Sequence, residues 1–358
     1  MVLHPFPTLL SGTIREHKGC LFSSEKTLPP LPHYAKLLER YFYSMYKSIL
    51  YFSFIVFAFL FAADNLDAKK TYKYKDENGL WHFTDRPPAT DQPVEVEQVY
   101  VSGNEKKVLV ESRGSRYEPY IHVHNLYRGP VEMVFEAIST ENAAFTPPLP
   151  ISVVIPAMTE VDLFSIKAVQ KNKRWAYRFR HSYVPGKPDA VHKPEKPYRP
   201  PIERGVTFLL SQAFGGDYSH NDPWNQYAVD IAMPEGSPVY AARGGIIMDI
   251  ARDFYTGGSD MEKYGERANY VRILHDDGTM AVYAHLKLES VRYGLGRRIE
   301  EGAFIAESGS TGFSSGPHLH FVIQRNTGMA IESLPFQFEG EGGRAYTPEK
   351  GMVLEVLM

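Results

Sequence analysis

The sequence predicts a mainly β, multidomain protein. Its 26 prolines, 28 glycines and 23 tyrosines favour turn-rich β structure over helical bundles. Short runs of alternating apolar and polar residues, separated by turn residues, recur through most of the chain. With 358 residues, 43% of them hydrophobic, the chain is long enough for two or three domains of ordinary size.

Charge and cysteine content exclude several classes of protein. The net charge of -3, without a long basic run, predicts no nucleic-acid binding. Cys20 is the single cysteine, which excludes a disulfide framework and any cysteine-based zinc site. A metal site in this chain would therefore need His, Asp or Glu ligands.

An uncharged apolar run, "SILYFSFIVFAFLFAA", occupies residues 48–63. Its length lies between that of a secretory apolar region and that of a membrane-spanning helix. We interpret residues 45–68 as a signal peptide or, alternatively, an uncleaved membrane anchor, and residues 1–44 as a mis-annotated extension. The segment predicts export to the periplasm or cell envelope, with membrane attachment if it is not cleaved.

Residues 69–99 are predicted to form a small β-hairpin domain. The run "TYKYKDENGLWHFTDRPP" alternates on both sides of an Asn-Gly turn and ends at a pair of prolines. It resembles a small domain of unknown function found near the N-terminus of many bacterial envelope proteins.

Residues 100–184 are predicted to form a β-sandwich of immunoglobulin-like type, because six strand-like runs are spaced by turn residues. Such a module binds or spaces rather than catalyses. His122 and His124 alternate with apolar residues on one of these runs, so both should lie on one strand face. We expect that face to point to solvent, without carboxylate partners, and to hold no metal. The first of the six runs is "QVYVSG", at residues 98–103.

Six prolines in residues 185–201 predict an extended, semi-rigid spacer, so residues 185–202 are interpreted as a domain linker. A second β-rich block, with glycine-rich turns, follows at residues 203–338. Residues 339–358 are interpreted as a C-terminal tail.

Three strand patterns in this block carry side chains that can bind metal. The first holds Asp230, the second is the outgoing strand of a predicted hairpin and holds His285, and the third holds His318 and His320. Because Cβ directions alternate along a strand, His318 and His320 should point to the same side. Zinc in a hydrolase takes three protein ligands and keeps a fourth position open for water. Asp230 and His320 would supply two ligands, and His285 and His318 could flank the water.

Three motifs occur in a fixed order: "AVDIAMPEGSPVYAARGGII", "VYAHL" and "GPHLHF". Together they resemble the lysostaphin/LytM-like zinc metalloendopeptidases of bacterial cell walls. The resemblance implies an antiparallel β domain, a bound Zn²⁺ and hydrolysis of peptide bonds in peptidoglycan. It also implies that Asp230 and His320 are zinc ligands, while His285 and His318 act on the water or on the tetrahedral intermediate.

Two positions depart from the family pattern, since Gln226 stands in place of its histidine and Ala228 in place of its glycine. The ligand histidine that usually lies four residues before the aspartate is replaced here by Gln226, and neutral glutamine is a weak zinc ligand. We predict that His220, ten residues before Asp230, reaches in from the preceding loop and completes the ligand set. The alternative is an incomplete site in a catalytically inactive LytM-like protein that binds or activates other cell-wall hydrolases. A third class, a plain structural or adhesive β protein, would make the histidines incidental.

Overall fold

The computed structural model describes residues 68–75, 81–84, 95–100 and 107–356. Among these residues the regular elements are strands, apart from the four-residue helix α2 (Met261–Tyr264) and the 3-10 turn η1 (Glu341–Gly343). The prediction of a mainly β protein is therefore confirmed. The predicted extension and nearly all of the predicted export segment lie outside the described residues. Within the described residues, no helix is both long and apolar enough to cross a membrane.

A small antiparallel sheet forms the N-terminal unit, with strand order β2-β1-β3. Its strands are β1 (Ala68–Lys75), β2 (Trp81–Thr84) and β3 (Glu95–Tyr100). β1 and β2 pair in the antiparallel register expected of the predicted hairpin, with Lys75 opposite Trp81. The third strand corrects an expectation. The start of the "QVYVSG" run pairs with β1 here instead of opening the sandwich.

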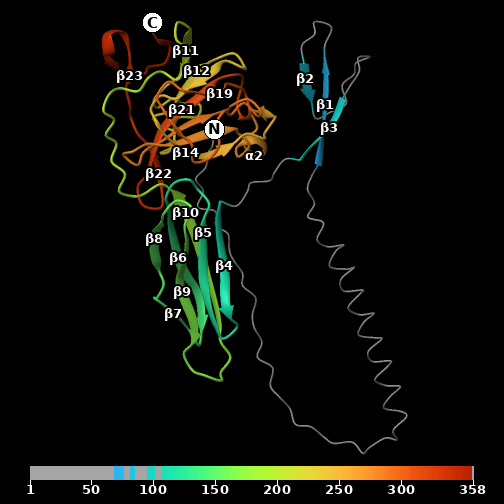
Figure 1. Ribbon diagram of the computed structural model, residues 1–358, viewed down its shortest axis with the longest axis vertical. Helices are drawn as coiled ribbons and strands as arrows, with labels where there is room; N and C mark the ends of the chain where they lie inside the picture. The colour runs from blue at the N-terminus through green and yellow to red at the C-terminus, as the bar shows by residue number, and fades with distance from the viewer. Residues whose placement is uncertain (1–67, 76–80, 85–94, 101–106, 357–358) are drawn as a thin grey trace, which may run out of the picture. The chain divides into compact units, whose positions relative to one another are not determined.

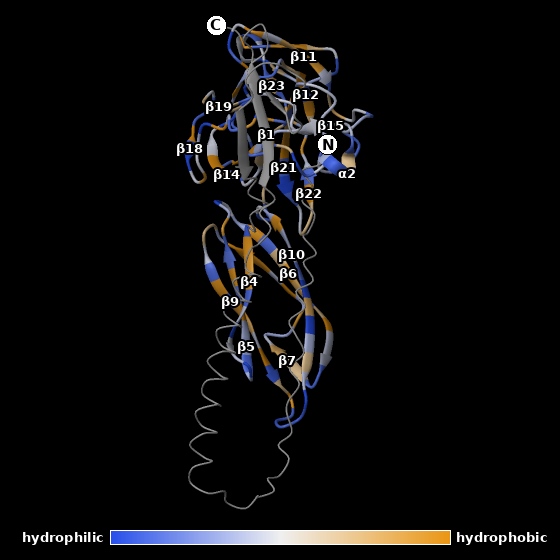
Figure 2. Ribbon diagram, turned by 90° about the vertical axis from the view of Figure 1, so that its right-hand side faces the viewer, coloured by the Kyte–Doolittle hydropathy of each residue, from blue (hydrophilic) through white to orange (hydrophobic). Residues whose placement is uncertain are grey.

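Two antiparallel sheets follow, with strand orders β10-β6-β8 and β4-β5-β9-β7. Figure 1 shows their strands grouped together, and Figure 2 shows apolar and polar segments alternating along them. The bounds are β4 (Val108–Ser115), β5 (Glu118–Asn125), β6 (Val131–Glu141), β7 (Ala143–Thr146), β8 (Ile151–Ile155), β9 (Glu160–Ala168) and β10 (Ala176–Pro185).

Aromatic contacts join these two sheets face to face. The Phe135 ring of β6 packs edge-on against Phe164 of β9, with ring centroids 5.4 Å apart. Phe179 of β10 also packs edge-on against Phe164. All three side chains are buried in one core, as alternate residues of packed sheets should be. The two sheets thus form a sandwich around that core, whereas its immunoglobulin-like type stays a prediction.

The histidine pair on β5 differs from expectation. His122 is buried, not solvent-facing, and two carboxylates of β9 contact it. Its Nδ1 lies 2.7 Å from Asp162 Oδ1 and its Nε2 lies 3.2 Å from Glu160 Oε2. The cross-strand register explains the contacts, because it places Asp162 opposite His122 and Glu160 opposite His124. Reading β5 by itself could not show which residues stand opposite it.

A nine-stranded antiparallel sheet dominates the C-terminal region, with order β18-β14-β16-β17-β21-β12-β11-β25 and with β22 paired to β21. Its strands are β11 (Thr207–Gln212), β12 (Val229–Ala232), β14 (Gly245–Ala251), β16 (Tyr270–Leu274), β17 (Met280–Ala284), β18 (Arg298–Ile299), β21 (Leu319–Asn326), β22 (Ile331–Ser333) and β25 (Val353–Glu355). Smaller pairs surround it: β13 (Pro238–Tyr240) with β19 (Phe304–Glu307), β15 (Gly257–Gly258) with β20 (Gly312–Phe313), and β23 (Phe338–Glu339) with β24 (Ala345–Tyr346).

The middle of this sheet brings the predicted site residues together. β21 lies between β12 and β17, and its register places His320 opposite Asp230 on one side and opposite Ala284 on the other. All five residues of β17 and almost all of β21 are buried, and the core face of β21 is apolar, with Leu319, Phe321 and Ile323. Leu319 points into the main core, so His318 and His320 face away from it.

The proline-rich segment packs against the C-terminal sheet instead of acting as a spacer. Tyr198 and Ile202 are almost fully buried and belong to the core of the C-terminal region. Backbone bonds fix the segment, since Tyr198 N donates to Gln337 O and Val191 N donates to Asp277 O. The tail also contributes, because β25 pairs with β11. The domain boundaries themselves stay predictions.

Several polar contacts join the sandwich to the C-terminal sheet, and two of them involve buried acidic side chains. The Lys107 ammonium pairs with the buried carboxylate of Asp249. The Asn326 amide donates to Glu132 Oε2 at 2.9 Å. The core of the sandwich also includes Met280 of β17. Residues 107–356 therefore share a continuous packed interior across this junction.

Asp277 is expected to stabilise the folded protein. Its carboxylate accepts bonds from Thr279, from the Arg243 guanidinium and from Lys193 N in the proline-rich segment. Burial acts to raise the pKa of Asp277, but these bonds overcome it and hold the pKa well below its usual range. Asp277→Asn should lower the free energy of unfolding by about 1–3 kcal/mol near pH 7.

A depressed pKa in the folded state stabilises at any pH above the unfolded value, near 4, and the effect is lost as the pH falls below it. The difference between wild type and Asp277→Asn should therefore shrink below about pH 4, as measured by urea unfolding from pH 3 to 7. Asp276→Asn, at an exposed neighbouring position, is the control and should change little. Equal effects of the two variants would contradict the assignment.

Candidate metal centre

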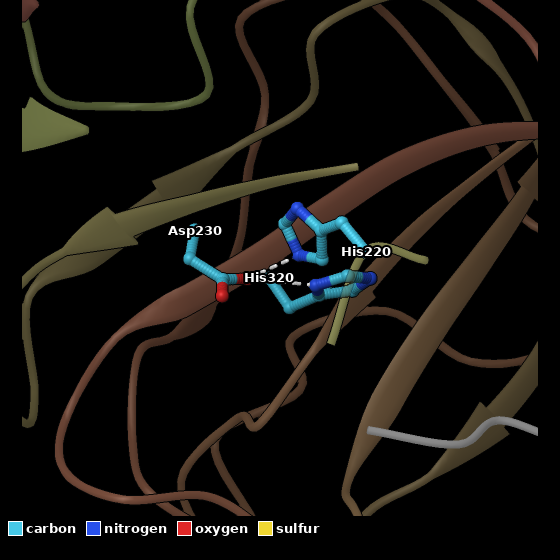
Figure 3. A group of neighbouring side chains, drawn as sticks. All are labelled: His220, Asp230 and His320. Atoms are coloured by element: carbon cyan, nitrogen blue, oxygen red, sulfur yellow. Dashed lines mark hydrogen bonds and ion pairs between the residues drawn. The ribbon is translucent and has the colours of Figure 1, made fainter. Parts of the chain in front are cut away.

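Three buried side chains converge on one point beside the central strands. His220 comes from the loop between β11 and β12, Asp230 from β12 and His320 from β21. Each offers one ligand atom, and these atoms lie within 4.8 Å of one another (Figure 3). Asp230 Oδ1 is the common neighbour, at 2.8 Å from His320 Nδ1 and 3.2 Å from His220 Nε2.

Proton counting shows that this group suits a cation. His220 Nδ1 lies 2.9 Å from the carbonyl oxygen of Ala213, which can only accept, so this nitrogen must carry the proton of a neutral ring. His220 Nε2 then turns a lone pair toward the carboxylate of Asp230. Two lone pairs 3.2 Å apart repel each other unless the ring gains a second proton or a cation lies between them. Two imidazoles and a carboxylate are a donor set that fits a divalent metal ion.

The pKa shifts of Asp230 and His320 agree with a site that binds a cation. Burial acts to raise the pKa of Asp230, but the contacts with His220 and His320 overcome it and hold the pKa well below its usual value. Burial lowers the pKa of His320 to about 3. At neutral pH the site therefore offers a carboxylate and a neutral His320 imidazole, the forms in which these groups bind metals.

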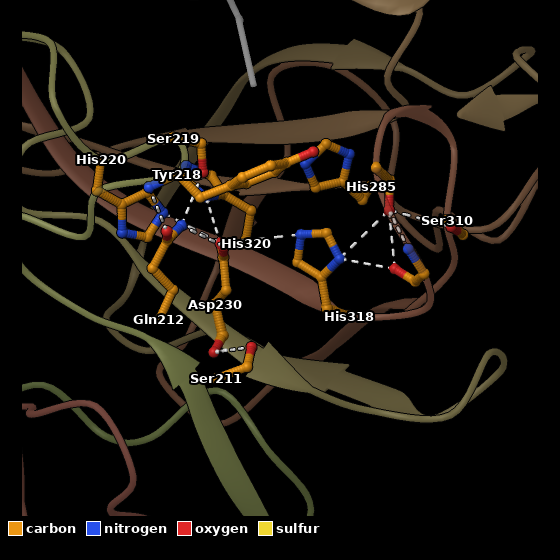
Figure 4. A network of polar contacts seen from close by, with 12 residues as sticks. Ser211, Gln212, Tyr218, Ser219, His220, Asp230, His285, Ser310, His318 and His320 are labelled. Carbon is orange, nitrogen blue, oxygen red and sulfur yellow. Dashed lines mark hydrogen bonds and ion pairs between the residues drawn. The ribbon is translucent and has the colours of Figure 1, made fainter. Parts of the chain in front are cut away.

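His285 and His318 lie beside this group, with ring centroids 4.6 Å apart. Their Nδ1 atoms donate to backbone carbonyls, His285 to Thr311 at 2.7 Å and His318 to Gly316 at 2.8 Å. The Nε2 atoms of both rings therefore carry lone pairs that face the site. His318 Nε2 lies 3.8 Å from Asp230 Oδ1. Burial lowers the pKa of His285 well below its ordinary value, so its imidazole is neutral. Figure 4 shows the two rings side by side.

The backbone at His285 is strained, which sequence patterns could not show. His285 lies one residue beyond the end of β17, not within the strand as expected, and its φ is 61°. The carbonyl of Leu286 accepts from Thr311 Oγ1 at 2.8 Å and from the Asn269 amide at 3.2 Å. Thr311 therefore holds both the ring of His285 and the chain that follows it.

Gln226, the position at which the sequence comparison expects a ligand, is exposed, whereas His220 is buried. The carbonyl of Gln226 accepts from Gly215 N at 2.7 Å and so closes the base of the loop that carries His220. The structure thus brings His220, not Gln226, to Asp230.

A pocket of about 250 Å³ opens next to the centre. Asp230, His285 and His318 line it, together with Tyr218 and Phe313, whose rings stack with centroids 5.9 Å apart. The two aromatic residues were not among the sequence-predicted site residues, because Tyr218 lies in a turn and Phe313 in a two-residue strand, neither of which carries a periodic pattern. The pocket gives a substrate access to the carboxylate and to both flanking histidines.

Comparison with known families agrees with this geometry. Residues 225–332 match the model of peptidase family M23, a range that includes Asp230, His285 and His320 and begins five residues after His220. Residues 57–105 match the domain of unknown function DUF4124. The C-terminal region of the chain is therefore a domain of peptidase family M23, preceded by a DUF4124 domain.

Curated relatives match the same part of the chain. An uncharacterized metalloprotease of Haemophilus influenzae is 31% identical over 126 residues, which are 35% of this chain and 24% of that protein. The glycyl-glycine endopeptidase ALE-1 of Staphylococcus capitis is 34% identical over 116 residues, 31% of this chain and 29% of the relative. The peptidoglycan DD-endopeptidase ShyA of Vibrio cholerae is 36% identical over 94 residues, 26% of this chain and 19% of the relative. The chain spans less than a third of the length of these relatives.

Thr311→Val tests the support of His285. The change keeps the side-chain shape but removes the hydroxyl that accepts from Asn269 N and donates to Leu286 O, leaving two buried backbone groups without that partner. We expect a loss of about 1–3 kcal/mol in the free energy of unfolding, measured with urea. Thr327→Val, at an exposed turn, is the matched control and should change stability little. If Thr311→Val leaves the free energy of unfolding unchanged, Thr311 does not have this supporting role.

Proposed function

We propose that this protein is a zinc metalloendopeptidase that hydrolyses peptide bonds in bacterial peptidoglycan. The observation that carries the proposal is the meeting of His220 Nε2 and His320 Nδ1 at one oxygen of Asp230, which calls for a cation. Membership of the C-terminal region in peptidase family M23 supports the reaction class. Two relatives whose names describe peptide-bond cleavage, one of them in peptidoglycan, support the substrate class.

Zinc is the metal that the donor set favours. It commonly takes imidazole nitrogens and a carboxylate oxygen in catalytic sites, with three protein ligands and an open fourth position. His220, Asp230 and His320 would hold it, and the neighbouring pocket leaves one side of Asp230 accessible. Bound there, zinc supplies a Lewis acid that polarises the scissile carbonyl and makes water a better nucleophile.

His285 and His318 would carry the proton and stabilise charge. Their Nδ1 protons are committed to Thr311 O and Gly316 O, so each ring can accept a proton only at Nε2, beside the pocket. One of the two would take the proton of the attacking water at Nε2, and the other, with a second proton taken up at Nε2 from solvent in the pocket, would donate to the oxyanion. The backbone bonds keep both rings oriented without help from the substrate.

We further propose that the protein is exported to the cell envelope. Peptidoglycan lies outside the cytoplasm, and the apolar run at residues 48–63 is uncharged, with a length between those of an export segment and a membrane-spanning helix. Fractionation of cells that produce the full chain tests this proposal, and recovery only in the cytoplasmic fraction would contradict it.

Zinc binding by His220 can be separated from any role of Gln226. Purified His220→Ala should lose bound zinc, because two protein ligands hold zinc far less tightly than three. Gln226→Ala should keep about one zinc per chain. Elemental analysis after dialysis, with thermal melting to confirm folding, measures both. Full zinc occupancy in His220→Ala would overturn this ligand set.

Changes to the flanking histidines should separate chemistry from metal binding. His318→Ala and His285→Ala should each keep zinc but cleave purified peptidoglycan about 10²- to 10⁴-fold more slowly than wild type, because proton transfer is impaired. Release of soluble peptide fragments measures the rate. If wild type binds zinc but releases no fragments, the non-catalytic binding role is the better account.

A further inference from the structure

Gln212 contacts both the carboxylate of the metal centre and the loop that carries His220. Its amide nitrogen donates to Asp230 Oδ2 at 2.9 Å and to Ser219 Oγ at 2.7 Å. Its amide oxygen accepts from Tyr218 N at 3.3 Å. Both amide protons and the oxygen are thus engaged, and Figure 4 shows the side chain between Asp230 and the loop.

The fold places Gln212 there through an irregularity in β11. The pairing of β11 with β12 shifts register between Leu210 and Gln212, and the shift puts Gln212 directly opposite Asp230. Bulges of this kind re-aim a side chain and are frequent next to active sites. The residue skipped by the shift, Ser211, donates its hydroxyl to Asp230 O at 3.1 Å and so ties the same residue by its backbone.

The contact with Gln212 gives the two carboxylate oxygens of Asp230 different partners. Oδ2 is occupied by the Gln212 amide, whereas Oδ1 faces His220 and His320. A carboxylate fixed in this way presents a single oxygen to the centre and cannot rotate to present both. Partners behind the ligands commonly orient them in metal sites and set their affinity.

The approach of the loop to Gln212 requires a glycine. A Cβ atom added at Gly216 would lie 2.3 Å from Gln212 Cγ and 2.7 Å from Gln212 Cδ, closer than any real contact. The loop can therefore close over the Gln212 side chain only because position 216 has no side chain. This clash is independent of the hydrogen bonds and points to the same residue.

We propose that Gln212 is a positioning residue of the metal centre, one that holds Asp230 in single-oxygen presentation and fixes the loop of His220 against it. The proposal rests on the function proposed above, because it concerns the affinity of the same centre for zinc. Gln212 is neither one of the three candidate ligands nor one of the residues that line the pocket, so its effect would reach the reaction through Asp230 and the loop of His220.

Gln212→Met is the first test, because it keeps the length of the side chain and removes the amide. The full chain should bind zinc about 10- to 100-fold more weakly, as measured by competition with a chromophoric chelator. Gln212→Glu, which replaces the amide donor with an acceptor, should also weaken binding. Gln226→Met applies the same chemical change at an exposed position and should bind zinc as wild type does. Melting of the metal-free variants shows that they are folded at the assay temperature.

Gly216→Ala is the second test, because its methyl group would displace the Gln212 side chain. Alone, it should weaken zinc binding in the same direction as Gln212→Met. In a Gln212→Ala background the obstructed side chain is gone, so Gly216→Ala should add little further loss. If Gly216→Ala weakens zinc binding equally in the wild-type and Gln212→Ala backgrounds, the glycine does not act through Gln212. That result would overturn the part of Gly216 in the proposal.

Zinc affinity within about threefold of wild type in both Gln212→Met and Gln212→Glu would overturn the proposal, whatever their peptidase activity. A wild-type chain that binds no zinc would overturn this proposal and the proposed function together. A wild-type chain that binds zinc without cleaving peptidoglycan would overturn the proposed function alone, and a weaker affinity in the Gln212 variants would still support the role of Gln212.

Discussion

The structure of the C-terminal region depends on the crowding of polar atoms around Asp230 Oδ1. Three imidazole nitrogens, from His320, His220 and His318, approach this oxygen to 2.8, 3.2 and 3.8 Å in a buried setting. A buried carboxylate is costly unless its charge is compensated, and the Nδ1 atoms of His220 and His318 are bound to backbone carbonyls instead of to Asp230. The surrounding strands and loops are the means of holding these atoms together, in an arrangement that a bound cation would stabilise.

Strand register is the first of these means. Because β21 pairs with β12 on one side and β17 on the other, His320 is flanked by Asp230 and by Ala284, the residue before His285. A slip of one residue in either pairing would turn the opposing side chain to the core face of the sheet. The buried, nearly continuous apolar faces of β17 and β21 prevent such a slip, so the core that stabilises the sheet also sets the geometry of the site.

The sequence allowed some of this arrangement to be predicted, for identifiable reasons. Asp230 and His320 lie within strands, where alternation fixes the direction of a side chain, and their convergence with His220 agrees with the expected grouping. His285 lies just beyond a strand end with a left-handed backbone, which periodicity cannot signal. The partners of Gln212 and of His122 depend on a register shift and on cross-strand neighbours. Such contacts are not encoded in any local pattern.

His220 raises a separate constraint, because a candidate ligand on a loop has no strand register to hold it. The loop must be ordered by contacts of its own, at a cost in backbone entropy. The backbone N–H of His220 donates to Gly216 O, and its ring Nδ1 donates to Ala213 O. Beyond it, Pro223 O accepts from both the backbone and the hydroxyl of Ser333 on β22. The carbonyl of the exposed Gln226 closes the base of this loop, so a side chain presented from position 220 depends on a set of anchoring bonds that a strand residue would not need.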